Sequence, residues 1–343
     1  METELWQYLK TANKPIVLYG MGNGADKIIN ILNEKGISFQ GVFASDGFVR
    51  DKLFHGHKIS SYASLKEKFG DMIVLLCFGS SLPDVIENIL KIASEQELYA
   101  PEVPVIGGGL FDSDFLKKNA ESLHFVYNRL ADDISRHTFE NIIKYKLSGK
   151  ISYLLNCQVD ENEPYTSFLK LENERFLDLG AYNGDTVLGF TENFPKYDSI
   201  LAVEPDKKTF KKLLKNTENI KNLTTVNACI SDKCETVNFK MLGGRNSVLG
   251  DGKDQIEAVT IDSLTFNPTY IKMDVEGEEV AAIKGGSQTI LKGKPKMLIS
   301  AYHRTDDFIT IPKAVLGIRD DYKIYMRQSM WNVLSFWWRL QKK

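Results

Sequence analysis

The sequence predicts an α/β protein in which two doubly wound, Rossmann-like domains are joined by a helical connector. Three observations predict this class. Short, continuous apolar runs alternate with amphipathic helical segments, as in parallel sheets that are covered on both faces. The alternation stops near residue 112 and resumes near residue 174. A chain of 343 residues also has a length typical of two domains.

The first domain is expected over residues 1–111. Its apolar runs predict four strands, in "PIVLYG", "SFQGVFASD", "DMIVLLCFGS" and "VPVIGGG". Between them, apolar residues at three- and four-residue intervals predict helices in "ADKIINILNEKG", "SYASLKEKFG" and "LPDVIENILKIASEQ".

The connector, residues 112–160, shows helical periodicity and no strand-like run, and the polar "QVDENEPY" marks its end. The second domain is expected over residues 161–343. Its main sheet is predicted from the runs "RFLDLG", "SILAVEPD", "LTTVNACIS", "TYIKMDV", "KPKMLISAYH", "YKIYMR" and the aromatic C-terminal "MWNVLSFWWRLQKK". An extra strand pair is expected in "ETVNFKML" and "DQIEAVTIDSL".

Composition restricts the classes of function. The 43 basic and 45 acidic residues give a net charge of −2, which argues against nucleic acid as the main partner. The four cysteines form no Cys-x-x-Cys pair, so we expect reduced thiols and a cytoplasmic protein. No run approaches the roughly 18 apolar residues of a membrane span, and the N-terminus does not resemble a signal peptide. The aromatic C-terminus is expected to be a strand, with peripheral membrane contact as the alternative.

A first glycine turn, "YGMGNGA", follows the first predicted strand and precedes a helix. Gly20, Gly22 and Ala25 have the dinucleotide spacing G-x-G-x-x-G/A, and Asp46 ends the next strand. This context is suited to a nucleotide or nucleotide sugar at the Gly20-Gly22-Gly24 turn. The alternative is a purely structural turn between strand and helix.

A second glycine turn, "DLGAYNGDT", differs from a phosphate site because acids flank it. Asp178 ends the strand and Asp185 begins the helix, so a pyrophosphate there would meet fixed negative charge. A ligand with an adenosine body and a positive centre, such as S-adenosylmethionine, suits the turn better. We expect Asp178, Gly180, Tyr182, Gly184 and Asp185 to bind this cofactor.

The ends of the next two strands extend the cofactor site. Glu204 ends "LAVEPD", 24 residues after Gly180, where its carboxylate is expected to accept both ribose hydroxyls. Ala228 and Cys229 leave room for a flat adenine, whose amino edge Asn227 or Asp232 is expected to bind.

The fourth and fifth strand ends supply candidate catalytic residues. Alternation along "YIKMDVEGEE" directs Lys272, Asp274 and Glu276 into the same crevice, and "SAYHRTDD" adds His303. The following acids, residues 278–279, suit a helix N-terminus. Asp274, Glu276 and His303 are the candidate bases for an acceptor proton. The carboxylate pair resembles part of a metal site, but no third ligand has suitable spacing, so no metal site is predicted.

Residues ~174–327 resemble an FkbM-type methyltransferase, a class I S-adenosylmethionine-dependent family. The matching motifs, in order, are "FLDLGAYNGDT", "VEPD", "TIDSL" and "IKMDVEGEE". The resemblance implies a seven-stranded class I sheet and methyl transfer to a hydroxyl of a sugar, glycan or natural product, as in polysaccharide modification. The chain departs from the family after Arg327, where Gln328 and Ser329 replace a histidine-containing segment.

Two other classes of function remain as alternatives. One is a nucleotide-sugar oxidoreductase or epimerase that uses the first glycine turn, although a Tyr-x-x-x-Lys pair is not evident. The other is a non-catalytic binding scaffold. The sequence specifies neither the methyl acceptor nor the oligomeric state.

Overall fold

The computed structural model describes residues 2–45, 47, 49, 52–80, 82–107, 109–160, 163, 165–240, 248–249, 254–329 and 337–342. Contacts divide the chain into two compact units. The first comprises Met1–Glu121, Arg136–Asp160 and Gln328–Ser335, and the second comprises Ser122–Ser135, Glu161–Arg327 and Phe336–Lys343. The segment expected as a connector is therefore divided between the two units. Its helices are α5 (Ser113–Arg129), α6 (Asp133–Ser148) and α7 (Ser152–Asn156).

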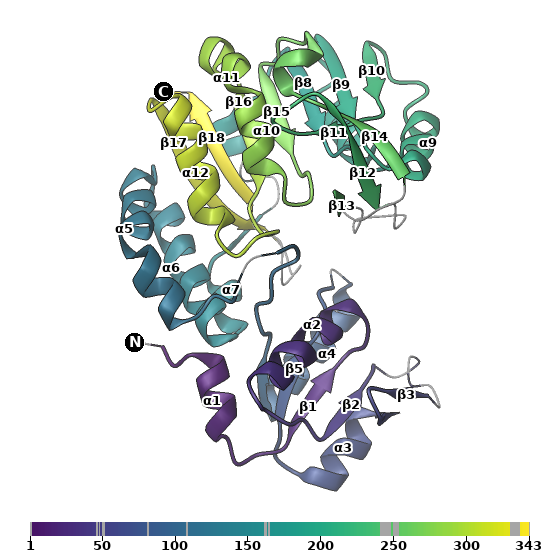
Figure 1. Ribbon diagram of the computed structural model, residues 1–343, viewed down its shortest axis with the longest axis vertical. Helices are drawn as coiled ribbons and strands as arrows, with labels where there is room; N and C mark the ends of the chain where they lie inside the picture. The colour runs from purple at the N-terminus through teal and green to yellow at the C-terminus, as the bar shows by residue number, and fades with distance from the viewer. Residues whose placement is uncertain are drawn as a thin grey trace. The chain divides into compact units, whose positions relative to one another are not determined.

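The first unit contains a six-stranded sheet in the order β3-β4-β2-β1-β5-β6 (Figure 1). All its ladders are parallel except the β3–β4 hairpin. The strands are β1 (Ile16–Tyr19), β2 (Gly41–Phe43), β3 (Leu53–Phe54), β4 (His57–Ser60), β5 (Ile73–Leu76) and β6 (Glu97–Tyr99). The helices before the connector are α1 (Leu5–Thr11), α2 (Asn23–Glu34), α3 (Tyr62–Phe69) and α4 (Pro83–Glu95).

The prediction of a strand in "VPVIGGG" is wrong. The strand next to β5 is β6, several residues earlier, and residues 101–107 are irregular. Pro104 has no N–H to donate to a ladder, and its carbonyl and that of Val105 accept hydrogen bonds from Lys27 Nζ at 3.0 and 2.6 Å. The Lys27 ammonium thus satisfies carbonyls that a neighbouring strand would satisfy in a ladder.

The second unit is built on the sheet order β10-β9-β8-β15-β16-β18-β17. The first five strands are parallel, and β18 runs antiparallel between β16 and β17. Seven strands were expected, whereas the sheet has eight: β7 (Gln158–Val159) pairs with Gln328 and Ser329 at the end of β17, and these four residues belong to the first unit. The strands are β8 (Arg175–Leu179), β9 (Ser199–Val203), β10 (Leu223–Val226), β15 (Tyr270–Met273), β16 (Lys296–Ser300), β17 (Tyr322–Ser329) and β18 (Trp337–Lys342).

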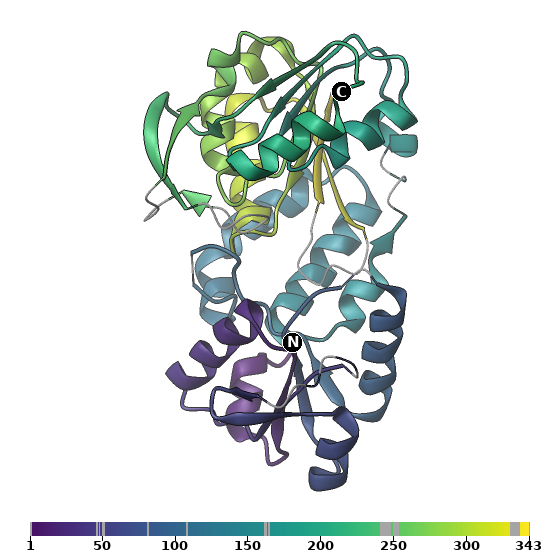
Figure 2. The ribbon, with the colours of Figure 1, turned by 90° about the vertical axis from the view of Figure 1, so that its right-hand side faces the viewer.

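Helices cover both faces of this sheet (Figure 2). After β10 the chain returns to the middle of the sheet and adds β15 and β16 on the other side of β8. Because parallel crossovers are right-handed, α8 and α9 lie on one face and α10, α11 and α12 on the other. The helical segments are η1 (Tyr165–Leu169), α8 (Asp185–Asn193), α9 (Lys207–Asn216), η2 (Ile261–Leu264), α10 (Glu279–Gly285), α11 (Ser287–Gly293) and α12 (Asp307–Ile318). The predicted α/β class is confirmed.

A second, four-stranded sheet has the order β11-β14-β12-β13, which confirms the expected extra strands. Its strands are β11 (Cys229–Ile230), β12 (Glu235–Lys240), β13 (Val248–Leu249) and β14 (Asp254–Val259). The single strand expected in "LTTVNACIS" is wrong, because β10 ends at Val226 and β11 pairs with β14 instead. Asn227 lies between β10 and β11, and its side-chain amide donates to the carbonyls of Glu204 and Pro205, both at 2.9 Å.

The core of the second unit fixes the strand ends. Phe176, Ile200, Tyr270 and Leu298, from four adjacent strands, are buried in one hydrophobic cluster. With the strands locked in register, Leu179, Val203, Met273 and Ser300 end at the same edge of the sheet. The order of strands switches from one side of the sheet to the other between β8 and β15, and open α/β sheets bind ligands at such a point.

Candidate active site at the carboxyl ends of the strands

The turn between β8 and α8 depends on glycines. Gly180 has a φ of +77°, and a Cβ there would lie 1.9 Å from the backbone carbonyl oxygen of Asp274. Gly184 has a φ of +90° and is the N-cap of α8. Tyr182, between them, also adopts a left-handed conformation, with a φ of +48°. The turn therefore lies directly against the end of β15, closer than any residue with a side chain permits.

Glu204 supports this turn from the end of β9. Its two carboxylate oxygens accept hydrogen bonds from the backbone N–H of Tyr182 at 2.9 Å and of Asp206 at 2.8 Å. Only 6% of the residue is exposed. Burial raises the pKa of Glu204 to about 7, against the effect of the two N–H groups. The structure thus places Glu204 beside the second glycine turn, as the sequence predicts.

Asp178 and Lys272 form an ion pair under the turn. They are cross-strand neighbours on β8 and β15, and Lys272 Nζ lies 3.3 Å from Asp178 Oδ1. The ammonium also donates to the carbonyl of Gly180 at 2.8 Å. Burial raises the pKa of Asp178 above its ordinary value, while Lys272 opposes the rise. Burial alone would lower the pKa of Lys272, but the neighbouring carboxylates outweigh it and raise that pKa.

This pair differs from the sequence expectation for both residues. Asp178 has no exposed surface, so its carboxylate faces Lys272 instead of an open ligand site. The side chain of Lys272 likewise faces Asp178 and not an open crevice. Its position on β15 agrees with the prediction, but its direction does not. Asp185, in contrast, is exposed at the start of α8, where its carboxylate accepts from the N–H of Thr186 at 2.8 Å.

The residues expected around adenine differ in their burial and in their hydrogen-bond partners. Ala228 and Cys229 are buried beside the end of β10, and burial raises the pKa of the Cys229 thiol to about 12. The amide of Asn227 donates to backbone carbonyls, and Asp232 is exposed. Cys229 and Glu204 interact electrostatically, which puts this segment near the predicted ribose contact.

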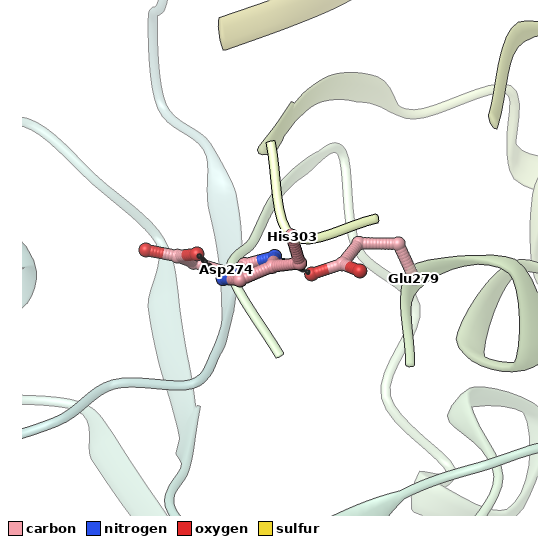
Figure 3. Close-up of side chains that lie close together, drawn as sticks. All are labelled: Asp274, Glu279 and His303. Atoms are coloured by element: carbon pink, nitrogen blue, oxygen red, sulfur yellow. Dashed lines mark ion pairs between the residues drawn. The ribbon is translucent and has the colours of Figure 1, made fainter. Parts of the chain in front are cut away.

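His303 gathers carboxylates from two elements (Figure 3). Its side chain has no exposed surface, and its Nε2 lies 3.5 Å from Asp274 Oδ1 and 3.4 Å from Glu276 Oε2. Its Nδ1 lies 3.0 Å from Glu279 Oε1. Burial alone would lower the pKa of His303, but the surrounding carboxylates raise it well above its usual range. The structure therefore brings together the three candidate catalytic residues.

Two members of this cluster were missed in the sequence. Glu279 begins α10, as expected of a helix N-terminus, but it is also fully buried and accepts from the N–H of Val275 at 3.0 Å. Asp307 is 1% exposed, accepts from the N–H of Arg304 at 2.7 Å, and has a pKa raised by burial to about 7. An acid directly after a buried strand and its turn was the available signal for Glu279.

Arg327, the last residue shared with the family pattern, makes contacts that stabilise the fold. It is 2% exposed and donates to the carboxylates of Asp132 and Glu163, with Nη2 and Nε at 2.7 and 3.0 Å from their oxygens. Its guanidinium lies over the rings of Phe168 and Tyr325, 5.2 and 5.8 Å from their centroids. These contacts hold β17 rather than an acceptor.

The first glycine turn, in the other unit, also has close backbone contacts. Gly22 is the N-cap of α2 with a φ of +113°. A Cβ on Gly24 would lie 2.2 Å from the carbonyl oxygen of Cys77, and a Cβ on Gly20 would meet the ring of Phe78. Asp26 lies in the first turn of α2, 2.7 Å from His55. Asp46, the expected ribose contact, lies outside the described residues.

The strand order and the glycine turn of the second unit define an α/β methyltransferase-like domain. Residues 178–331 match the family model of the methyltransferase FkbM domain. The resemblance to FkbM-type methyltransferases drawn from the sequence motifs is therefore confirmed.

Solved structures were also compared with this chain. The chain is similar to the methyltransferase FkbM from Methylobacillus flagellatus KT, with a TM-score of 0.76 and 21% identity, over 95% of this chain and 90% of that chain. A precorrin-6y C5,15-methyltransferase from Geobacter metallireducens GS-15 matches with a TM-score of 0.36 and 13% identity, over 51% of this chain and 83% of that chain. Aeropyrum pernix fibrillarin matches with a TM-score of 0.33 and 14% identity, over 49% of this chain and 66% of that chain.

No curated protein matches the sequence. Within the described part of the chain, no helix combines the length and the apolar character needed to cross a bilayer.

Proposed function

We propose that this protein is an S-adenosylmethionine-dependent methyltransferase that methylates a hydroxyl group of a sugar, glycan or natural product. One observation carries the proposal. The turn at Gly180 is pressed against the backbone of Asp274, while Glu204 holds the same turn from the other side. A cofactor bound on this turn would thus have a ribose partner on one side and acceptor-binding groups on the other.

The cofactor contacts follow from this placement. Glu204 accepts the ribose hydroxyls with the lone pairs that its two backbone contacts leave, since each carboxylate oxygen has two. The backbone of Gly180, Tyr182 and Gly184 surrounds the methionine part. Asp185, at the rim, favours the positive charge of the sulfonium and α-amino groups.

The acceptor is bound at Asp274 and Glu276. Both side chains are 25% exposed, whereas His303 is fully buried behind them. An acceptor hydroxyl therefore reaches a carboxylate and not the imidazole. We assign Asp274 to orienting the hydroxyl, Glu276 to accepting its proton and His303 to positioning both carboxylates.

The reaction is an in-line displacement at the methyl carbon. The hydroxyl oxygen forms the new C–O bond as the C–S bond breaks, the proton passes to Glu276, and the products are a methyl ether and S-adenosylhomocysteine. Alignment of the two reactants supplies on the order of 7–11 kcal/mol in well-oriented systems. A positioned base typically adds roughly 10²–10⁴-fold in rate.

We assign oxygen as the acceptor atom from the FkbM resemblance. The first glycine turn is a separate proposal: a nucleotide or nucleotide sugar bound at Gly20, Gly22 and Gly24 would deliver a sugar acceptor to the same chain. Asp26 weakens attraction for a phosphate at this helix, and its pairing with His55 offsets part of that effect.

Calorimetry with the full-length protein tests the proposal. We expect S-adenosylmethionine to bind, Glu204→Ala to abolish binding, and the control Glu192→Ala, an exposed residue of α8, to leave it unchanged. Binding of NAD(P) that Gly22→Val removes, with no binding of S-adenosylmethionine, would overturn it in favour of an oxidoreductase. Transfer of a radiolabelled methyl group to cell-envelope glycans or nucleotide sugars then identifies the acceptor.

A further inference from the structure

The cluster around His303 has the donor set of a cation site. One ligand atom from each of Asp274, Glu279 and His303 lies within 4.8 Å of the other two. Bonds from a divalent cation to oxygen or nitrogen are about 2.0–2.2 Å, so two ligands of one ion lie at most roughly 4.4 Å apart. Asp274 Oδ1 faces Nε2 of His303 and Glu279 Oε1 faces its Nδ1, so a change of side-chain rotamer is needed to bring all three donors onto one ion.

Buried donor atoms in the cluster lack satisfactory partners. His303 is fully buried, and although carboxylate oxygens lie 3.0–3.5 Å from its ring, neither nitrogen makes a hydrogen bond of normal geometry within the described structure. Oε2 of Glu279, also fully buried, has no hydrogen-bond partner among the described residues. Buried polar atoms normally have a hydrogen-bond partner, and a bound ion can take the place of one.

The charges in the cluster do not balance. Asp274, Glu276 and Glu279 surround one imidazole, so even a protonated His303 leaves an excess of two negative charges in a largely buried site. Uncompensated charge of this kind is costly to bury. A divalent cation beside a neutral imidazole would reduce the excess of the three carboxylates from three negative charges to one.

We infer that Asp274, Glu279 and His303 bind a divalent cation at the carboxyl ends of β15 and β16. Carboxylate oxygens favour Mg²⁺ and Mn²⁺, while imidazole favours the later transition metals, so the mixed set is best suited to an ion of the Mn²⁺ type. The sequence shows the pair Asp274 and Glu276 without a third ligand, whereas the structure groups Asp274 with Glu279 and His303.

The role of the ion rests on the proposed methyltransferase function. A cation beside Asp274 would bind the acceptor hydroxyl and lower its pKa, as metal-bound water shows. The proton still passes to Glu276, and the oxygen then attacks the methyl carbon as its bond to sulfur breaks. No oxidant or further reactant is needed.

The test uses Mn²⁺ alone with the full-length, chelator-treated protein. Electron paramagnetic resonance of free Mn²⁺ gives the number of bound ions and their affinity, without S-adenosylmethionine. We expect one saturable site, weakened at least tenfold by Asp274→Asn and by Glu279→Gln. Glu278→Gln is the matched control, because that carboxylate is adjacent in sequence but lies 3.4 Å from Arg304. It should bind Mn²⁺ like the wild type.

Asp274 is partly exposed, so its variant tests the inference even if the Glu279 variant fails to fold. Non-saturable binding, or equal affinity in the wild type and Asp274→Asn, would overturn the inference. Calorimetry with S-adenosylmethionine on the same samples separates the two proposals. Mn²⁺ binding without cofactor binding refutes only the methyltransferase function, and cofactor binding without Mn²⁺ binding refutes only the cation site.

Discussion

The ion pair of Lys272 and Asp178 gives a direct test of what holds the cofactor turn. In Lys272→Met the side chain keeps a similar length, but the charge next to Asp178 and the donor to the Gly180 carbonyl are removed. At 3.3 Å and an effective dielectric constant of about 20, the lost attraction is roughly 5 kcal/mol. Removing one partner of a buried pair usually costs about 3–5 kcal/mol.

Protonation of Asp178 limits this loss. At pH 7, taking up a proton costs an aspartate with an unfolded-state pKa of 3.9 about 4 kcal/mol, and at pH 5 the cost falls to about 1.5 kcal/mol. Because the folded-state pKa of Asp178 is raised above its unfolded value, the folded variant binds more protons between the two values. The variant should therefore lose stability as the pH rises from about 4 toward 7.

Urea unfolding of the full-length chain at pH 5 and pH 7 measures both effects. We expect Lys272→Met to lose about 3–4 kcal/mol at pH 7, and less at pH 5. In Asp178→Asn/Lys272→Met the loss should be at least about 1 kcal/mol smaller than the sum of the single losses. Lys284→Met, at an exposed position of α10, should change stability by less than about 0.5 kcal/mol. A loss below about 1 kcal/mol at pH 7, or additive single losses, would show that the ion pair does not stabilise the folded chain.

Three further predictions concern the same unit. Gly180→Ala should lose at least about 2 kcal/mol in urea unfolding, since a positive φ alone costs an alanine about 1–2 kcal/mol and its Cβ meets a backbone carbonyl; Gly189→Ala, inside α8 with open space around it, should gain up to about 1 kcal/mol. Arg327→Lys should lose about 2 kcal/mol because a lysine does not form the paired, stacked contacts, while Arg319→Lys, in a partly exposed pair with Asp321, should lose under 1 kcal/mol. The pKa of about 7 for Glu204 predicts that S-adenosylmethionine binding in calorimetry weakens from pH 8 to pH 6, as the carboxylate is protonated, and that Glu204→Gln removes this dependence. Stable Gly180→Ala, equal losses in the two arginine variants, or pH-independent binding by the wild type would each contradict the corresponding prediction.

The central strands of both sheets were predictable because each is a buried apolar run. Ile73–Leu76 and Tyr270–Met273 are fully buried, as their sequences indicate. Short edge strands were not predictable in this way. The hairpin β3–β4 has mainly partly exposed residues, and residues 103–107 are apolar yet irregular, so hydrophobicity distinguishes neither from its neighbours.

Part of the site was predictable by the same reasoning. Parallel strands end at one edge of the sheet, so residues that follow them, such as Glu204 and Asp274, lie together whatever their separation in sequence. The roles of Asp178 and Lys272 were less accessible. Alternation indicates the face of a strand, but only the register of β8 against β15 shows that the two side chains neutralise each other.

The arrangement around His303 shows where alternation stops being informative. It assumes an extended chain, and β15 ends at Met273. Glu276 and Gly277 then adopt left-handed conformations, with φ values of +54° and +95°, which fold the chain back on itself. Glu279 consequently lies under the turn, where it accepts from the N–H of Val275. If the period-two pattern continued past the strand, Glu276 would be the most deeply buried of these carboxylates. The turn instead buries Glu279, the carboxylate that together with Asp274 and His303 forms the proposed cation site.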